Sequence, residues 1–420
     1  MRRVLFIVSL FLVLLLPHNV NANPVSLSPD DYIPLAIETL RESLVRQDVE
    51  PLEEFVDAAE NRVFKDKHTP QRIAKRLVGI IGSGMVGEVD DIVSPELQKR
   101  LKAIADGITT KRSVIFECKP REFKFPRDNG KHYFLAEWWY FNGHMYTEDG
   151  SPFGYELCFF RVLPSIYFCH VAVTDERGNH FSYERKMIKP WDAKISKKRC
   201  DLRMGPWWVK QTGPGAFSIH GEVKGYTFNL DLETEREAFV INGNGVIDMP
   251  EGANSYYYSF TKIKHKGVLI KNGKSMPVTG QSWFDHQWGN FIAFRHGWDW
   301  FSFQMEDGSQ YNLFSFRLAN DETWKQYVNI LRPDGSTVHE RGMDVERLAW
   351  WKSPQTGLTY VTKWRLHLPY TNETIEVDAV IPQQEVASRD LLDLPPTYWE
   401  GRCKVEHTAG PSKGVKGLCY

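Results

Sequence analysis

Three motifs that mark common active sites are missing from this sequence. No two of the six cysteines have CxxC spacing, and neither an HExxH motif nor a Walker phosphate-binding loop is present. These absences disfavour a CxxC zinc site, a thioredoxin-like redox centre, a zincin and a P-loop nucleotide site. We therefore expect neither a metal ion nor a cofactor.

An excess of charge of either sign is also missing. The 420 residues include 52 Lys and Arg against 53 Asp and Glu, for a formal net charge of −1. This balance gives no electrostatic reason to expect nucleic acid or an anionic membrane surface as a partner. The length is typical of two or three domains.

Long apolar runs are missing after the first 22 residues. The chain opens with MRRVLFIVSLFLVLLLPHNVNAN, in which two arginines precede an apolar run from Val4 to Leu16 and a small-residue site that ends at Ala22. This order is typical of a secretory signal peptide, and the run is shorter than the about 20 residues of a membrane span. We expect residues 1–22 to be removed and the protein to be exported, to the periplasm or outside the cell. An uncleaved anchor is the alternative.

Tryptophan is missing from the first third of the chain, since all 14 lie at or beyond Trp138. In that first third, Ser28-Pro29, Thr69-Pro70 and Ser94-Pro95 each place a hydroxyl ahead of a proline. A capping hydroxyl followed by proline is typical of a helix start. We predict an α-helical N-terminal extension over residues 23–112.

After residue 112 the sequence changes to short runs of aromatic and β-branched residues, which are typical of strands. Turn signals separate these runs at Asp149-Gly150, Arg177-Gly178, Asn272-Gly273, Asp307-Gly308 and Asp334-Gly335. Many short strands with little helix between them predict a mainly β protein built from antiparallel barrels or sandwiches. This part is long for one barrel, so we expect two domains that meet near Asp307-Gly308.

Export permits disulfides but does not require them. Six cysteines allow 15 complete pairings, and the spacing selects none of them. Cys158 and Cys169 flank a predicted turn at Pro164, so a cross-strand bridge between them is one hypothesis. Buried free thiols are the alternative.

Rings and ionisable groups alternate in two stretches, LAEWWYFNGHMY and SWFDHQW. In a strand, successive side chains point to opposite faces, so Glu137 and Trp139 are expected on one face and Trp138 and Tyr140 on the other. Rings on both faces indicate that neither face is solvated. We expect one face to line a barrel interior and the other to pack against a second domain.

The same alternation separates Asp285 from His286 in SWFDHQW. Asp285 is expected beside Trp283 on one face, and His286 beside Trp288 on the other. A simple Asp–His dyad is therefore not expected in a regular strand, and only a bulge would bring the two side chains together.

The order of the motifs EWWYFNGHM, GYELCFFR, YFCHVAVTD, SYYYS, SWFDHQWG, GWDWFSFQ and a late YWEG resembles the AttH/CrtC family. This family includes carotenoid 1,2-hydratases, AttH-like exported proteins and predicted secreted hydrolases. The resemblance spans residues 113–410 and implies two lipocalin-like antiparallel β-barrel domains. With the junction given above, these domains are placed at residues 113–306 and 307–420.

Carotenoid hydratases add water across an isolated double bond, which needs a proton donor in an apolar pocket. The family's aspartate matches Asp285 by motif. Tyr256 and Tyr258 stand where the resemblance places a histidine and a tryptophan, and Trp283 stands where it places a tyrosine. The resemblance therefore implies a ring-lined cavity with a buried acid more firmly than it implies carotenoid hydration.

Two sets of candidate site residues follow. The catalytic candidates are Asp285, His286, Tyr258 and Glu137. The ligand-binding candidates are Trp138, Trp139, Tyr140, Arg161, His170, Tyr256, Trp283, Trp288, Trp298 and Trp300. The structural alternatives are that Asp285 caps a turn or pairs with Arg295, that both histidines are core residues, and that the tryptophans form the core.

Two classes of function are consistent with these residues. The first is an enzyme that hydrates, hydrolyses or isomerises a lipid or isoprenoid-like substrate with Asp285 as general acid, because burial among rings raises the pKa of a carboxyl group. The second is a non-catalytic carrier or chaperone for a hydrophobic molecule, with an ABC-type export transporter as its candidate partner. The oligomeric state stays open.

We predict that the mature protein begins at Asn23, since Val20 and Ala22 satisfy the small-residue rule of signal cleavage. N-terminal sequencing of the exported protein checks this. Exported protein that still begins at Met1 would show instead that the segment is retained as an anchor.

Overall fold

The computed structural model describes residues 118–420 except 133, 135, 163–165, 250–252, 290, 292–296, 319–321 and 388–396. The expected signal peptide and helical extension, residues 1–22 and 23–112, lie outside these described residues. Within them the chain is nearly all strand, which confirms the mainly β prediction. No helix in this part of the chain is long and apolar enough to cross a membrane.

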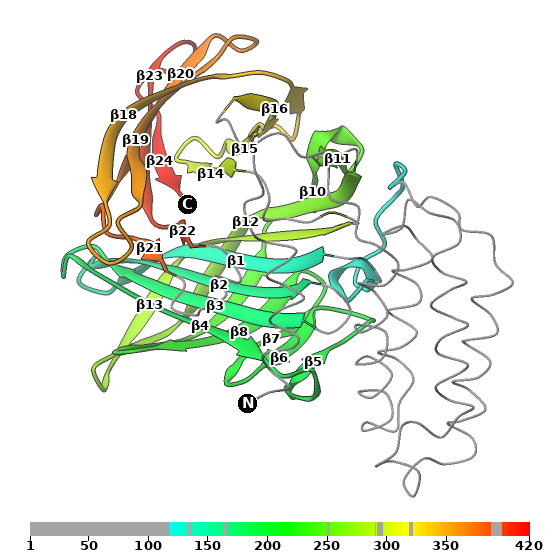
Figure 1. Cartoon of the computed structure of the whole chain (residues 1–420), viewed down its shortest axis with the longest axis vertical. Helices are drawn as coiled ribbons and strands as arrows, with labels where there is room; N and C mark the ends of the chain where they lie inside the picture. Colours follow the sequence, from blue (N-terminus) through cyan, green and yellow to red (C-terminus); the bar gives the residue numbers. More distant parts are fainter. Residues whose placement is uncertain are drawn as a thin grey trace, which may run out of the picture.

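The first sheet is antiparallel and curves into a barrel-like body, which occupies the lower half of Figure 1. Its order is β4-β3-β2-β1-β13-β12-β9-β8-β7-β6-β5, and β10 and β11 also pair with β12. Its strands are β1 (Ala136–Thr147), β2 (Pro152–Val162), β3 (Ile166–Asp175), β4 (His180–Ile188), β5 (Ala193–Ile195), β6 (Asp201–Met204), β7 (Trp207–Gly213), β8 (Ala216–Val223), β9 (Tyr226–Thr234), β10 (Phe239–Val240), β11 (Val246–Met249), β12 (Ala253–Lys271) and β13 (Lys274–Gly289).

The second sheet, yellow to red in Figure 1, is also antiparallel and arches over the first. Its order is β17-β16-β15-β14-β24-β23-β20-β19-β18. Its strands are β14 (Gly297–Met305), β15 (Gln310–Arg317), β16 (Thr323–Leu331), β17 (Thr337–Glu340), β18 (Asp344–Lys352), β19 (Thr359–Leu368), β20 (Glu373–Ala379), β23 (Cys403–Ala409) and β24 (Lys416–Cys419).

Five short elements complete the described chain. A two-stranded ribbon of β21 (Glu385–Val386) and β22 (Tyr398–Trp399) lies between the two sheets in Figure 1. The others are the 3-10 turns η2 (Arg127–Asn129), η3 (Pro190–Asp192) and η4 (Ile241–Gly243).

The chain passes from the first sheet to the second between Gly289 and Gly297, the end of β13 and the start of β14. The expected junction at Asp307-Gly308 therefore falls inside the second sheet, where it forms the β14–β15 turn. The second tryptophan stretch, which includes Trp298 and Trp300, begins the second sheet and does not end the first. A turn signal marks a change of strand direction but cannot distinguish a hairpin from a domain junction.

The five sequence turns each connect two consecutive strands of one sheet. The clearest is Asn272-Gly273 between β12 and β13, where φ is 49° at Asn272 and 83° at Gly273. Two successive residues with positive φ define the type I′ turn, whose twist matches that of the flanking strands. Asn and Gly tolerate this conformation, which explains why the sequence signal is dependable.

Both faces of β1 and β13 are buried. One face belongs to the core inside the first sheet, which includes Trp139, Phe141, Phe284 and Trp288. The other face points to the second sheet, where Tyr257, Phe314 and Tyr327 form a separate apolar cluster. As expected, one face lines an interior; the other packs against the second sheet.

Gln304 of β14 ties the two sheets together. Its amide nitrogen donates hydrogen bonds to the main-chain carbonyls of Thr261 and Ser282, each at 2.8 Å. Both acceptors belong to the first sheet, on β12 and β13. A buried amide that satisfies two carbonyls at once fixes how far the sheets stand apart at this point.

All six cysteines are free and buried thiols, as the second hypothesis held. A bridge between Cys158 and Cys169 is wrong, because the register places Phe159 opposite Cys169 and His170 opposite Cys158. The two cysteines are thus on opposite faces of the sheet. Their spacing along a hairpin is compatible with a bridge, but their side chains point to opposite faces of the sheet.

We predict that Trp283→Ala lowers the free energy of unfolding by about 3–5 kcal/mol, because a large buried side chain would leave a cavity. Trp283 is fully buried and its ring meets that of Trp300 edge-on at 6.5 Å. Urea unfolding followed by circular dichroism measures the change.

Trp350→Ala is the matched control, since that ring on β18 is 58% exposed. Its effect should stay within about 0.5 kcal/mol. Equal losses for the two variants would contradict the assignment of Trp283 to the junction of the sheets.

Candidate functional site between the two sheets

Three of the four catalytic candidates, Glu137, Tyr258 and His286, meet inside the first sheet. The Tyr258 hydroxyl lies 2.9 Å from His286 Nδ1, and His286 Nε2 lies 3.0 Å from Glu137 Oε1. His132 extends this inner cluster, with Nδ1 2.9 Å from Glu137 Oε1 and Nε2 3.1 Å from Asp128 Oδ1. Asp285 is on the other face of β13 and takes no part, as the alternation predicts.

The inner cluster holds its carboxyl group, that of Glu137, in the ionised form. Burial alone would raise the pKa of Glu137, but hydrogen bonds from His132 and His286 lower it to about 2. Burial lowers the pKa of His286 to about 4, against the opposing effect of Glu137. Glu137 is therefore ionised at neutral pH, and a carboxyl group with so low a pKa is a poor proton donor.

His132, Glu137 and His286 are also a donor set that can hold a metal ion, and their ligand atoms lie within 4.8 Å of one another. Two ring nitrogens already hydrogen-bond Glu137, and Arg161 Nη2 is 3.5 Å from its second oxygen. A cation would have to displace both hydrogen bonds beside a guanidinium group. The hydrogen-bonded network satisfies these residues without one.

Asp285 lies on the opposite face of β13, between the two sheets, and is 3% exposed. Its Oδ1 accepts hydrogen bonds from Ser259 Oγ and, at 2.6 Å, from Trp283 Nε1. Its Oδ2 accepts one from the Tyr257 hydroxyl at 2.5 Å. Three donors from β12 and β13 thus fix the orientation of the carboxyl group.

The second sheet completes this arrangement through Tyr257. Trp300 Nε1 of β14 and Asn312 Nδ2 of β15 donate to the Tyr257 hydroxyl at 3.0 and 2.9 Å. Tyr257 therefore accepts two hydrogen bonds from one sheet and donates its own proton to a carboxyl group of the other.

Asp285 does not share a face of the sheet with Tyr256 and Tyr258, the two candidates from SYYYS. Those two rings point into the first sheet, where they join its core. The middle tyrosine of SYYYS, Tyr257, is the one that contacts Asp285. Strand parity decides this, because Ser259 is directly opposite Asp285 and Tyr257 is two residues from Ser259 on the same face.

The pKa of Asp285 is raised from its ordinary value to about 7 by burial, against three hydrogen bonds that lower it. Among the described residues, which do not include Arg295, no cation contributes to this balance, in contrast to Glu137 beside Arg161. A carboxyl group with such a pKa is populated in both protonation states at neutral pH. It can therefore donate a proton or accept one.

More buried polar residues lie on the same face of the first sheet. The Tyr140 hydroxyl donates to Glu400 Oε1 at 2.7 Å, and the Tyr398 hydroxyl donates to Glu156 Oε1 at 2.7 Å. His170 Nδ1 lies 2.6 Å from the Tyr398 hydroxyl. Sequence reasoning missed Glu156, Glu400, Tyr398 and Tyr257, although YELCFF and YWEG repeat the pattern of an acid beside rings.

The ligand-binding candidates divide between the two faces. Inside the first sheet are Trp139, Arg161, Tyr256 and Trp288. On the face toward the second sheet, or on that sheet itself, are Trp138, Tyr140, His170, Trp283, Trp298 and Trp300. Trp298 is 37% exposed at the start of β14. Arg295, the expected alternative partner of Asp285, lies outside the described residues.

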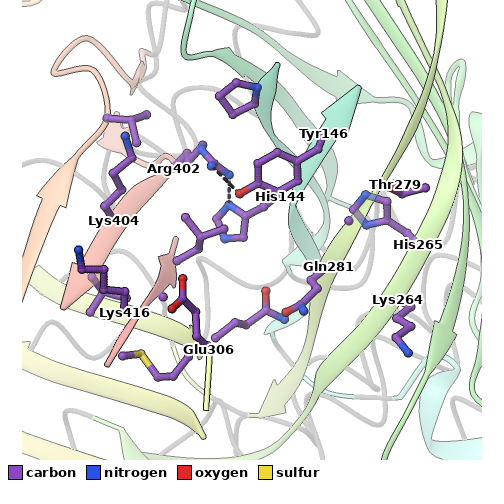
Figure 2. Close-up of a pocket in the computed structure, with 18 of the residues that line it drawn as sticks. His144, Tyr146, Lys264, His265, Thr279, Gln281, Glu306, Arg402, Lys404 and Lys416 are labelled. Atoms are coloured by element: carbon purple, nitrogen blue, oxygen red, sulfur yellow. Dashed lines mark hydrogen bonds between the residues drawn. The ribbon is translucent and has the colours of Figure 1, made fainter. Parts of the chain in front are cut away.

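A cleft of about 1790 Å³ also opens between the sheets, and Gly280, Gln281 and Gln304 form part of its lining. Figure 2 shows Arg402 beside His144 and Tyr146 in this cleft. The guanidinium lies 2.8 Å from His144 Nδ1 and donates to Glu176 at 3.0 Å. Asp285 does not line the cleft, so the cleft and the buried carboxyl group are separate features of the space between the sheets and not one pocket.

A GxSxG letter pattern occurs in GPSKG, residues 410–414. It forms the turn between β23 and β24, where Ser412 Oγ donates to Glu373 at 2.9 Å. A nucleophile elbow needs a strand followed by a helix and a base at the serine. This turn has neither, so it is not a serine hydrolase site.

Comparison with known proteins gives a family and a fold. The AttH-like family model matches residues 117–420. A candidate AttH of Nitrosomonas europaea superimposes with a TM-score of 0.65 at 23% identity, covering 71% of this chain and 96% of that one. Kievitone hydratase of Nectria haematococca gives 0.62 at 15% identity, covering 71% and 91%. No curated protein matches the chain in sequence.

We predict that Asp285→Asn changes the pH dependence of stability. A folded pKa of about 7 lies above the unfolded value, so the stabilising contribution of Asp285 is full below about pH 4 and is lost as the pH rises to 7. Asparagine cannot ionise. The difference in unfolding free energy between variant and parent should shift in favour of the variant by up to about 4 kcal/mol from pH 4 to pH 8.

Urea unfolding of both proteins across this range measures the difference. The contributions of groups that titrate in both proteins largely cancel in the difference between their unfolding free energies. A difference that does not change with pH would mean that Asp285 titrates near its ordinary value.

Proposed function

Because the chain belongs to the AttH-like family, we propose that it is a hydratase-type protein which binds a hydrophobic, lipid or isoprenoid-like molecule between its two sheets. Asp285 acts as the general acid. The observation that carries this proposal is a fully buried carboxyl group with a pKa of about 7, held by Ser259, Trp283 and Tyr257. A solved structure named kievitone hydratase shares this fold at 15% identity, and its name supports the reaction class.

Hydration of an isolated double bond begins when an acid adds a proton to one carbon, which leaves positive charge on the other. The surroundings of Asp285 suit both parts of this step. Burial favours the neutral form that donates, and the faces of Trp283 and Trp300 can stabilise a developing cation. Hydrolysis and isomerisation of such a substrate share the same protonation and are the neighbouring reaction types.

Tyr257 supports the acid through its hydroxyl group. Trp300 and Asn312 fix its orientation, so its proton points to Asp285 whichever protonation state the carboxyl group has. When Asp285 gives up its proton, this hydrogen bond stabilises the carboxylate that results. The second sheet therefore contributes to the proton donor although the donor belongs to the first.

Export is part of the proposal and rests on the N-terminal segment of the sequence. A basic start, an apolar run and a small-residue site before Asn23 favour secretion across a membrane. A protein that binds hydrophobic molecules outside the cytoplasm requires a transporter to supply them. An ABC-type export system is the candidate partner.

A carrier without catalysis is the second candidate, and the cleft is the observation that favours it. The cleft is wide enough for a ligand and does not reach Asp285, whose two oxygens are already occupied by protein donors. A carrier needs the cleft but not the acid.

We predict that the parent protein incorporates oxygen from oxygen-18 water into farnesol or into a lipid extracted from its own host. Asp285→Asn should lower this turnover about 10²- to 10⁴-fold, the usual contribution of a general acid. Ligand retention, followed by native mass spectrometry, should survive because the side chain keeps its shape. Asp192→Asn, at an exposed position, is the matched control and should leave turnover unchanged.

Turnover by the parent that survives in Asp285→Asn would remove Asp285 from the chemistry. A bound lipid in the absence of turnover by the parent would favour the carrier.

A further inference from the structure

A single line of side chains crosses the face of the first sheet that looks toward the second. The register sets Ser259 opposite Asp285, Asp285 opposite Tyr140, Tyr140 opposite Cys158 and Cys158 opposite His170. Directly opposite residues on neighbouring strands point to the same face. The acid of the proposed function is therefore two strands from Cys158 and three from His170.

The ribbon strand β22 covers the far part of this line. Its Tyr398 hydroxyl contacts Glu156 and His170, and Glu400, the residue after β22, accepts a hydrogen bond from Tyr140. Glu156 is in turn opposite Asn142 in the register. One short segment from a distant part of the chain thus adds a third carboxyl group, Glu400, to Asp285 and Glu156 of the first sheet.

Three carboxyl groups surround Tyr140 and Cys158. Burial raises the pKa of the Cys158 thiol, and Glu156, Glu400 and Asp285 raise it further. Burial also raises the pKa of Tyr140, with Glu400 and Glu156 adding to the effect. Asp285 and Glu400 are thus close enough to act on the same groups, and Glu400 is half-buried where Asp285 is enclosed.

Among the described residues, two buried polar atoms of this region have no hydrogen-bond partner. They are Glu156 Oε2 and His170 Nε2, and both side chains are at most 1% exposed. Buried polar atoms are almost always satisfied. Both residues contact the Tyr398 hydroxyl. An open carboxyl oxygen and an open ring nitrogen on two residues that share this contact match a water molecule or a hydroxyl group, which can donate and accept at once.

We propose that Glu400 is the base of the same reaction, and that it activates a water molecule held by Glu156 and His170. This deepens the proposed function and rests on it. Asp285 and Glu400 then serve as an acid and base pair, one from the first sheet and one from the segment that follows β22.

The step balances without a cofactor. The proton of Asp285 bonds to one alkene carbon with the π electrons, and the water oxygen bonds to the other carbon. The second proton of that water passes to Glu400, so Asp285 ends ionised and Glu400 ends protonated. Tyr140, hydrogen-bonded to Glu400 and opposite Asp285, lies on the path that returns the proton.

Electrostatics favours this division of roles. Burial and the charge of Asp285 raise the pKa of Glu400 to about 7, while Tyr140 lowers it. Two carboxyl groups that disfavour each other's charge are most stable with one protonated and one ionised. That state is the one in which hydration starts.

The test separates protonation from water addition. Farnesol is incubated with each variant in deuterated or oxygen-18 water, and both isotopes are counted by mass spectrometry. In Glu400→Gln, oxygen-18 incorporation should fall about 100-fold, while deuterium exchange into the alkene stays within about threefold because Asp285 still donates. Asp285→Asn should lose both. Glu148→Gln, at an exposed position in the turn between β1 and β2, should lose neither.

The remaining outcomes are equally distinct. Full oxygen-18 incorporation by Glu400→Gln overturns the role of Glu400 and leaves the proposed function standing. Loss of both isotopes in a Glu400→Gln protein with the parent's unfolding midpoint would also overturn it. A parent protein that incorporates neither isotope refutes the proposed function for isoprenoid alkenes, and this inference with it.

Discussion

The two-residue period of β13, with both of its faces buried, is the constraint on which the rest of this structure depends. Phe284, His286 and Trp288 point into the first sheet, and Trp283, Asp285 and Gln287 point to the second. A shift of one residue in the register would exchange these sets. It would place His286 between the sheets and bury Asp285 in the interior, so the long pairings with β1 and β12 fix the chemistry as well as the fold.

Two buried acids illustrate what this constraint achieves. Glu137 and Asp285 are on neighbouring strands and both are almost fully buried, yet their pKa values are about 2 and about 7. Glu137 has Arg161 and two histidines beside it, whereas neutral hydroxyl and indole groups surround Asp285. Burial is common to both, and the presence or absence of a cationic partner decides which carboxyl group is held ionised.

The sequence was sufficient for features set by local periodicity. Alternation separates Asp285 from His286, and Asn-Gly or Asp-Gly pairs place the hairpins, because both depend on a few adjacent residues. Features set by distant contacts could not be derived. Glu400 reaches Tyr140 from 260 positions away along the chain, and nothing near either residue encodes that approach. The change of sheet before Gly297 likewise has no local signal stronger than an ordinary turn.

Among the described residues, burial and not a charged neighbour raises the pKa of Asp285, so this pKa depends on the exclusion of water. Any motion that parts the sheets and admits water near Trp283 returns the carboxyl group toward its ordinary acidity, while closure restores the dry state. The Gln304 amide, which joins the two sheets, therefore affects the pKa of Asp285 as well as the distance between the sheets. If Asp285 is the proton donor that we propose, its strength as an acid then depends on the contact between the two sheets that Gln304 makes.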